Sequence, residues 1–102
     1  GNAAVPGLTS PARIERDADG IPTLTAANRT DLARVTGFTH AQDRFFQMDL
    51  LRRRGAGELA ELLGPAVVDA DRQARVHGFR SLSERHLALL PAEDRTLLEA
   101  YA

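Results

Sequence analysis

Cysteine is absent from the 102 residues, which excludes disulfides and thiolate metal sites. Lysine is absent as well: all 13 basic residues are arginine, which we attribute to the codon composition of the gene. No apolar run approaches the length of about 18 residues that a membrane-spanning helix needs. A net charge of −1 provides no long-range field to attract nucleic acid or an anionic membrane. The sequence therefore disfavours a nucleic-acid binder and a membrane span.

The front of the chain predicts an irregular lead-in followed by a β-hairpin. Residues 1–11 contain two prolines, and because position 1 is not methionine we expect the first residues to be left by cloning. Residues 12–27 alternate weakly on both sides of the turn sequence Asp17-Ala18-Asp19-Gly20, in which Gly20 can take a positive φ. This turn matches only the start of a calcium-binding loop and lacks its terminal glutamate, so we interpret it as a hairpin turn.

Residues 28–102 are predicted to be helical, beginning with one long helix. It opens near Asn28–Asp31, where several residues can cap it, and closes with the positively charged run Arg52–Arg54 before a glycine-rich break. Gly37 inside it indicates close approach of another backbone or a local break. Large apolar residues, Phe45 and Phe46 among them, point to more than one side. Since such a helix is usually buried on more than one side, we expect it to be an internal helix of something larger.

Two or three shorter helices are expected after the break. The sequence predicts a short helix at Glu58–Leu63 with its leucines inward, followed by a connector at residues 66–70. It predicts another helix at Asp71–Leu90, with His86 on its apolar stripe. Pro91 starts a last helix. The predicted fold class is thus α+β and mostly helical, with an N-terminal hairpin, one long helix and shorter helices, within a single domain.

Polar side chains of the long helix share one arc of about 100° on a helical wheel. They are Thr36, His40, Asp43, Arg44 and Gln47. Two interpretations stay open: a polar network that lines a site, or a hydrogen-bonded face that docks the helix onto a neighbour. No nucleophile lies among these residues, and the three histidines of the chain have no spacing typical of a zinc site. The arginine run likewise leaves open an end-of-helix role or the binding of phosphate or a carboxylate.

Short blocks of sequence follow one another in a characteristic order and at compatible spacing. They are Arg16-Asp17-x-x-Gly20-Ile21-Pro22; Asp31-Leu32; Gly37-Phe38-x-His40-Ala41-Gln42-Asp43-Arg44-x-Phe46-Gln47-Met48; Arg52-Arg53; Gly57-x-Leu59-Ala60-Glu61-Leu62-Leu63-Gly64; Leu90-Pro91-x-Glu93-Asp94; and Leu98-x-Ala100-Tyr101-Ala102. In this order they resemble the front of the α chain in the penicillin acylase (penicillin amidase) family. The block from Gln42 to Met48 is the most specific part.

The resemblance implies an N-terminal-nucleophile hydrolase of αββα architecture, made as one precursor that cuts itself into an α and a β chain. Its nucleophile is a serine at the start of the β chain, with its own amino group as base. Substrates are small-molecule amides such as penicillins, cephalosporin side chains or acyl-homoserine lactones. The family residues that touch the acyl group, and its calcium ligand, come after Ala102. Residues 12–102 are therefore predicted to be an inactive N-terminal fragment of a periplasmic or secreted enzyme, with the rest of the α chain and the β chain as partners.

No residue of the chain is predicted to be catalytic or to bind a metal, because Ser10, Ser81 and Ser83 lack the context of a nucleophile. His40, Gln42, Asp43 and Arg44 are proposed as a structural polar network that fixes the long helix against the remainder of the enzyme. The alternative is a small helical module without catalysis, which self-associates into homo-oligomers through its apolar helix faces and serves in binding or regulation.

Overall fold

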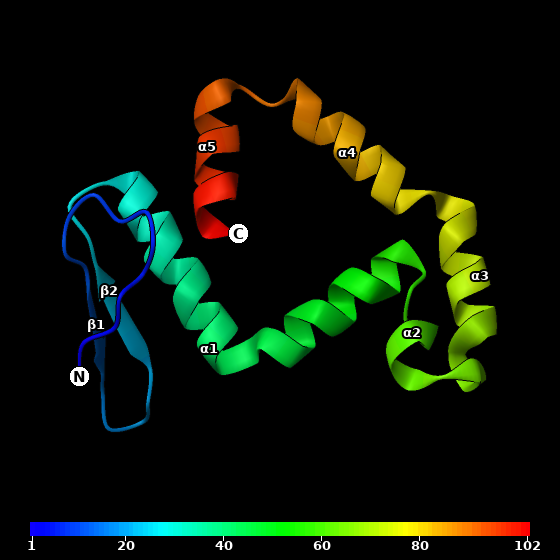
Figure 1. Cartoon of the computed structure of the whole chain (residues 1–102), viewed down its shortest axis with the longest axis horizontal. Coiled ribbons are helices and arrows are strands. Elements are labelled where there is room, and N and C mark those ends of the chain that lie inside the picture. Colours follow the sequence, from blue (N-terminus) through cyan, green and yellow to red (C-terminus); the bar gives the residue numbers. More distant parts are fainter. The chain divides into compact units, whose positions relative to one another are not determined.

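The computed structural model describes all 102 residues and confirms the predicted class (Figure 1). Its elements in chain order are β1 (Arg13–Arg16), β2 (Pro22–Thr25), α1 (Arg29–Ala56), α2 (Ala60–Leu63), a 3-10 turn η1 (Pro65–Val67), α3 (Val68–His77), α4 (Phe79–Leu89) and α5 (Ala92–Tyr101). They form two compact units. Residues 1–43 with 91–102 are called the hairpin unit, and residues 44–90 the helical unit.

The hairpin forms as its alternation and turn predict. Strands β1 and β2 are antiparallel, with Ile14 opposite Leu24, and both side chains are half-buried while their strand neighbours are largely exposed. In the turn, the Asp17 carboxylate accepts hydrogen bonds from the backbone of Asp19 and Ile21, at 3.0 and 2.8 Å. Gly20 has φ +80°, a region that favours glycine. The aspartate of the turn therefore serves its own backbone.

The core of the hairpin unit lies where α5 meets the first half of α1. Val35 and Ala100 are the two buried apolar residues of the chain, at 2% and 5% exposure. Close approach centres on Gly37: a Cβ there would lie 1.8 Å from the carbonyl oxygen of Tyr101. The buried hydroxyl of Thr39 donates to the carbonyl of Val35 at 2.7 Å, which satisfies it without a partner outside the helix. Gly37 thus permits the backbone contact that the sequence indicated.

Helix α1 departs from the predicted long helix at two points. Arg44 has non-helical dihedrals (φ −141°, ψ 19°), so the helix is interrupted there, at the boundary of the two units. At its end the helix continues through Gly55 to Ala56, and the chain breaks at Gly57, which has φ +71°. A helical wheel drawn through Arg44 is therefore wrong for the residues that follow it.

In the helical unit the expected helix Asp71–Leu90 is two helices. Gly78 takes the left-handed conformation (φ 62°, ψ 29°) and ends α3, so the chain has four shorter α-helices where two or three were expected. Helix α3 begins at Val68, inside the predicted connector. The apolar stripe is also wrong as a core face, because His86 is exposed and Val76 is 85% exposed. Breaking the helix at Gly78 removes the continuous stripe.

Apolar surface is abundant in both units. Thirteen large hydrophobic residues are exposed, among them Leu62 and Leu63, which were expected to point inward. The 11.1 kDa chain exposes 7728 Å². A compact monomer of this mass exposes about 5,700 Å², and two separate compact units of half the mass about 6,800 Å². The chain therefore leaves more surface uncovered than two independent small domains would.

Candidate functional site

His40 lies at the contact between α1 and α5. Its Nδ1 is 2.9 Å from the hydroxyl of Tyr101, and the two rings meet edge to face with centroids 5.7 Å apart. Helix α1 brings His40 to this place because it lies three residues after Gly37, where the backbone of Tyr101 approaches most closely. The histidine therefore joins two parts of this chain.

Gln42 and Asp43 meet the hairpin through Arg16. The Nη2 atom of Arg16 donates to the carboxylate of Asp43 at 2.8 Å and to the side-chain oxygen of Gln42 at 3.5 Å. Its Nη1 atom donates to the carbonyl of Gly20 at 3.0 Å. These groups are only partly buried, with side-chain exposures of 35% for both Arg16 and Asp43. The contact orients the hairpin on α1, and its contribution to stability is small, about 0–1 kcal/mol for an exposed pair.

The residues of the predicted polar arc lie in both units. Thr36 donates to the carbonyl of Leu32 within its own helix, at 2.7 Å. Because Arg44 interrupts the helix, it belongs with Gln47 to the helical unit, whereas His40 and Asp43 belong to the hairpin unit. The structure brings Gln42 and Asp43 together through Arg16 and places His40 on Tyr101. A role of these residues against the remainder of an enzyme stays a prediction.

A buried carboxylate at the start of α1 was missed. Asp31 has no exposed surface; it accepts hydrogen bonds from the backbone N–H of Thr9 at 3.0 Å, the hydroxyl of Thr9 at 2.7 Å and the side chain of Asn28 at 2.9 Å. Asn28 in turn accepts from the backbone N–H of Asp31, as an N-cap does. The pKa of Asp31 is lower than its ordinary value, chiefly because of the hydrogen bond from the backbone of Thr9 and then because of the bond from its hydroxyl. Asp31 thus ties the lead-in to α1.

Ion pairs join the last turns of α1 to the rest of the helical unit. Asp49 accepts from Arg52 at 2.7 Å and from Arg53 at 2.8 Å, and Arg53 also reaches Glu61 at 2.8 Å. Arg53 and then Arg52 lower the pKa of Asp49, while Asp49 and Glu61 raise the pKa of Arg53. Two arginines of the 52–54 run therefore serve carboxylates of their own unit.

A second buried carboxylate, Asp71, holds the start of α2. It is 6% exposed and accepts from the backbone N–H groups of Leu59 and Ala60, at 2.8 and 2.7 Å. One helical turn later, Arg75 donates to the carbonyl of Gly57 at 2.8 Å. These bonds satisfy backbone groups that would otherwise be left without partners where α1 ends.

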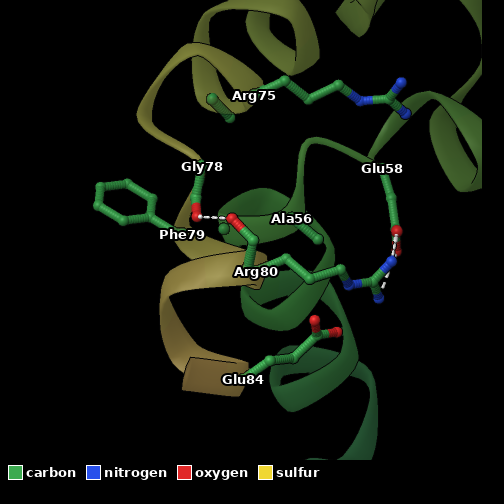
Figure 2. A pocket seen from close by; sticks show the side chains of 10 residues that line it. Ala56, Glu58, Arg75, Gly78, Phe79, Arg80 and Glu84 are labelled. Carbon is green, nitrogen blue, oxygen red and sulfur yellow. Dashed lines mark hydrogen bonds and ion pairs between the residues drawn. The ribbon is translucent and has the colours of Figure 1, made fainter. Parts of the chain in front are cut away.

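A hollow of about 440 Å³ lies beside this region (Figure 2). Arg80, from α4, pairs there with Glu58, and the hydroxyl of Ser81 donates to the carbonyl of Gly78 at 3.0 Å. Figure 2 shows Arg80 directed at Glu58, with Glu84 beside them. A serine acts as a nucleophile when a base accepts the proton of its hydroxyl. Ser81 instead donates to a backbone carbonyl, so it is not an activated serine.

The chain has neither a membrane-spanning helix nor a cluster of metal-ligating side chains. None of the helices combines the length and the hydrophobicity of a membrane-spanning segment. The described residues also bring together no group of three or more histidine, aspartate or glutamate side chains that could hold a metal ion.

Comparison with known proteins places these features in a family. The chain is 43% identical to a penicillin acylase 2 proenzyme of Pseudomonas sp. (strain SE83) over 99% of its own length and 13% of that protein. It is 35% identical to a penicillin G acylase of Escherichia coli, over 92% of its length and 11% of that protein. It is 32% identical to an acyl-homoserine lactone acylase of Pseudomonas aeruginosa, over 96% of its own length and 12% of that protein.

A solved structure gives the same result. The fold is similar to that of a thermostable penicillin G acylase from Alcaligenes faecalis, with a TM-score of 0.80 and 34% identity, over 90% of this chain and 49% of that one. The chain thus spans about an eighth of the length of the proteins it matches in sequence. The family model for penicillin amidase matches residues 11–102. The chain therefore belongs to the penicillin amidase family.

Proposed function

We propose that these residues form the N-terminal part of the α chain of an amidohydrolase, which removes the acyl group from a penicillin, a cephalosporin side chain or an acyl-homoserine lactone. The observation that carries the proposal is the family match along residues 11–102, in a chain that spans 13% of its proenzyme relative. Relatives named as penicillin acylases and acyl-homoserine lactone acylases support two of these substrate classes, and the cephalosporin side chain is our own extension of the first.

In this proposal the chemistry belongs to parts of the enzyme outside these residues. A serine at the start of the β chain attacks the amide carbonyl, its own α-amino group takes the proton, and hydrogen-bond donors stabilise the tetrahedral intermediate. The intermediate collapses with cleavage of the C–N bond, and the α-ammonium group gives its proton to the leaving amine. Water then hydrolyses the acyl-enzyme, which releases the acyl group as a carboxylic acid and restores the serine. The calcium expected in such an enzyme belongs to the same proposal, with its ligands in residues that follow these 102. A periplasmic or secreted enzyme belongs to the same proposal.

The present chain contributes scaffold. The Arg16–Asp43 pair and the Gly37–Tyr101 contact hold the hairpin and α5 on the first half of α1. The ion pairs of Arg53 with Glu61 and of Arg52 with Glu58 hold the second half to the residues that follow it in the helical unit. The exposed apolar side chains then serve as surfaces for the remainder of the α chain and for the β chain, since burial of such surface is the main driving force of assembly.

The test begins with the full reading frame. We expect the full-length precursor to cut itself into two chains and to hydrolyse at least one amide in a panel of penicillin G, a cephalosporin and acyl-homoserine lactones. The 102-residue chain alone should hydrolyse none of them. Hydrolysis by that chain, or a purified full-length protein that neither cuts itself nor cleaves any amide of the panel, would refute the proposal. A monodisperse homo-oligomer of the 102 residues that unfolds in one sharp transition would favour the self-associating module.

A further inference from the structure

A shallow hollow of about 500 Å³ in the helical unit has an apolar floor that the unit leaves open. It lies between the last turns of α1 and the corner where α3 meets α4. Leu51 and Phe79 line it and are 67% and 49% exposed, and Leu59 and Ala74 line it as well. Apolar side chains that remain this exposed around a concavity are typical of a surface that another protein part covers.

One wall of the hollow is a pair of stacked rings. His77 and Phe79 lie nearly parallel, at 18°, with ring centroids 5.2 Å apart. Gly78 between them takes the left-handed conformation that turns α3 into α4 and allows the two rings to stack. These two stacked rings are thus part of the lining and are positioned by the fold of the helical unit.

A cation without a carboxylate partner stands at the rim. Of the three arginines that close α1, Arg52 and Arg53 are paired with Asp49, and each reaches a further glutamate. Arg54 has no such pair; its side chain is exposed, and it lines the hollow. An arginine beside apolar surface suits recognition of a carboxylate by a planar fork of donors. This distinguishes the third arginine from the two that serve the unit itself.

We propose that this hollow receives an apolar side chain with a carboxylate beside it, supplied by the remainder of the same precursor and bound by Leu51, Phe79 and Arg54. The inference rests on the proposed function, in which such a remainder exists. A small molecule fits less well, because no buried charged side chain is directed into the hollow to fix one. The covalently linked remainder has the advantage over a second copy, since linkage gives it a high effective concentration at the hollow.

Thiol labelling tests the proposal, because the natural 102 residues contain no cysteine. Leu51→Cys and, on the exposed side of α3, the matched control Asp69→Cys are made in the full-length precursor, after replacement of any cysteine beyond residue 102. Asp69 is a suitable control because its side chain is 89% exposed. We expect a maleimide to label Leu51→Cys at least 50-fold more slowly than Asp69→Cys in the native protein, and equally fast in denaturant. Ala74→Cys gives a milder probe of the same hollow if Leu51→Cys does not fold.

The arginine is tested on the Ala74→Cys background. Arg54→Glu should raise the labelling rate at least tenfold, whereas Arg54→Lys, which keeps the charge, should raise it less than threefold. Equal labelling of hollow and control would overturn the proposal, as would protection that disappears on dilution, because the latter identifies a second copy as the occupant. If the precursor lacks amidase activity and the hollow is still protected, the proposed function fails and the docking stands. If the enzyme is active and the hollow is labelled freely, the docking alone fails.

Discussion

Replacing Gly37 by alanine separates what the isolated helix prefers from what the fold requires. Alanine is favoured over glycine inside a helix by about 1 kcal/mol, so a free helix would gain stability. In this fold the added Cβ would lie 1.8 Å from the carbonyl oxygen of Tyr101, closer than real Cβ contacts come. Helix α5 must therefore move away from α1. We therefore expect Gly37→Ala to be less stable than the unsubstituted chain, although alanine is the better helix former.

The magnitude follows from what α5 covers. Undocking would expose Val35 and Ala100, worth about 2–3 kcal/mol of apolar burial, and would break the hydrogen bond between His40 and Tyr101, worth about 1 kcal/mol. Subtracting the gain in helix propensity leaves a net loss of about 2–3 kcal/mol for the docking of α5. This loss concerns the hairpin unit alone, because the helical unit contains none of these residues.

The assay uses the composition of the chain. Tyr101 is the only tyrosine and there is no tryptophan, so the anisotropy of tyrosine emission reports α5 alone. In a urea titration of the 102-residue chain, Gly37→Ala should lower the anisotropy midpoint, while circular dichroism at zero urea shows undiminished helix. Gly55→Ala is the matched control, because its added Cβ meets nothing within 4 Å. Because Gly55 lies in the helical unit, this control should leave the anisotropy midpoint unchanged. If Gly37→Ala left the midpoint unchanged or raised it, the close contact with Tyr101 would be refuted.

Three further predictions concern the carboxylates. Because the pKa of Asp31 is lower in the folded chain, its carboxylate stabilises the fold fully above pH 3.8, the ordinary pKa, and this stability is lost as the pH falls through the folded pKa. Asp31→Asn should abolish this part of the acid unfolding curve, which circular dichroism follows between about pH 5 and 2. Asp71→Ala should destabilise the helical unit by about 1–2 kcal/mol in urea, as loss of a helix cap does, and Asp71→Asn by less. In a full-length enzyme Asp43→Ala should lower the yield of self-cleaved protein; a rise in KM with normal maturation would contradict the docking role.

Local chemistry made the hairpin and Gly37 predictable. The turn from Asp17 to Gly20 is specified by residues within four positions of one another, and its hydrogen bonds close inside that stretch. Gly37 stood out because glycine inside a long helix needs a reason, and the carbonyl of Tyr101 supplies it. Gly78 carried the same kind of signal, and the apolar stripe that continues past it obscured the left-handed turn.

Contacts between residues far apart in the chain could not be predicted from the sequence. The partner of Asp31 is Thr9, 22 positions earlier, and nothing near either residue indicates the pairing. Arg44 interrupts α1 without a proline or glycine, so no local preference marks the break. The network proposed for His40 and Asp43 assumed an unbroken helix. In the structure His40 contacts Tyr101 and Asp43 contacts Arg16, and a shared structural role of these residues stays a prediction.

The return of α5 to Gly37 has a consequence for synthesis on the ribosome. Residues 44–90 form a contiguous unit, whereas the hairpin unit is completed only when residues 91–102 have been made. Contacts between positions so far apart in sequence form late and slowly. The second unit along the chain should thus be the first to finish folding. A chain cut after Leu90 should still protect residues 44–90 from protease, and loss of that protection would contradict this order.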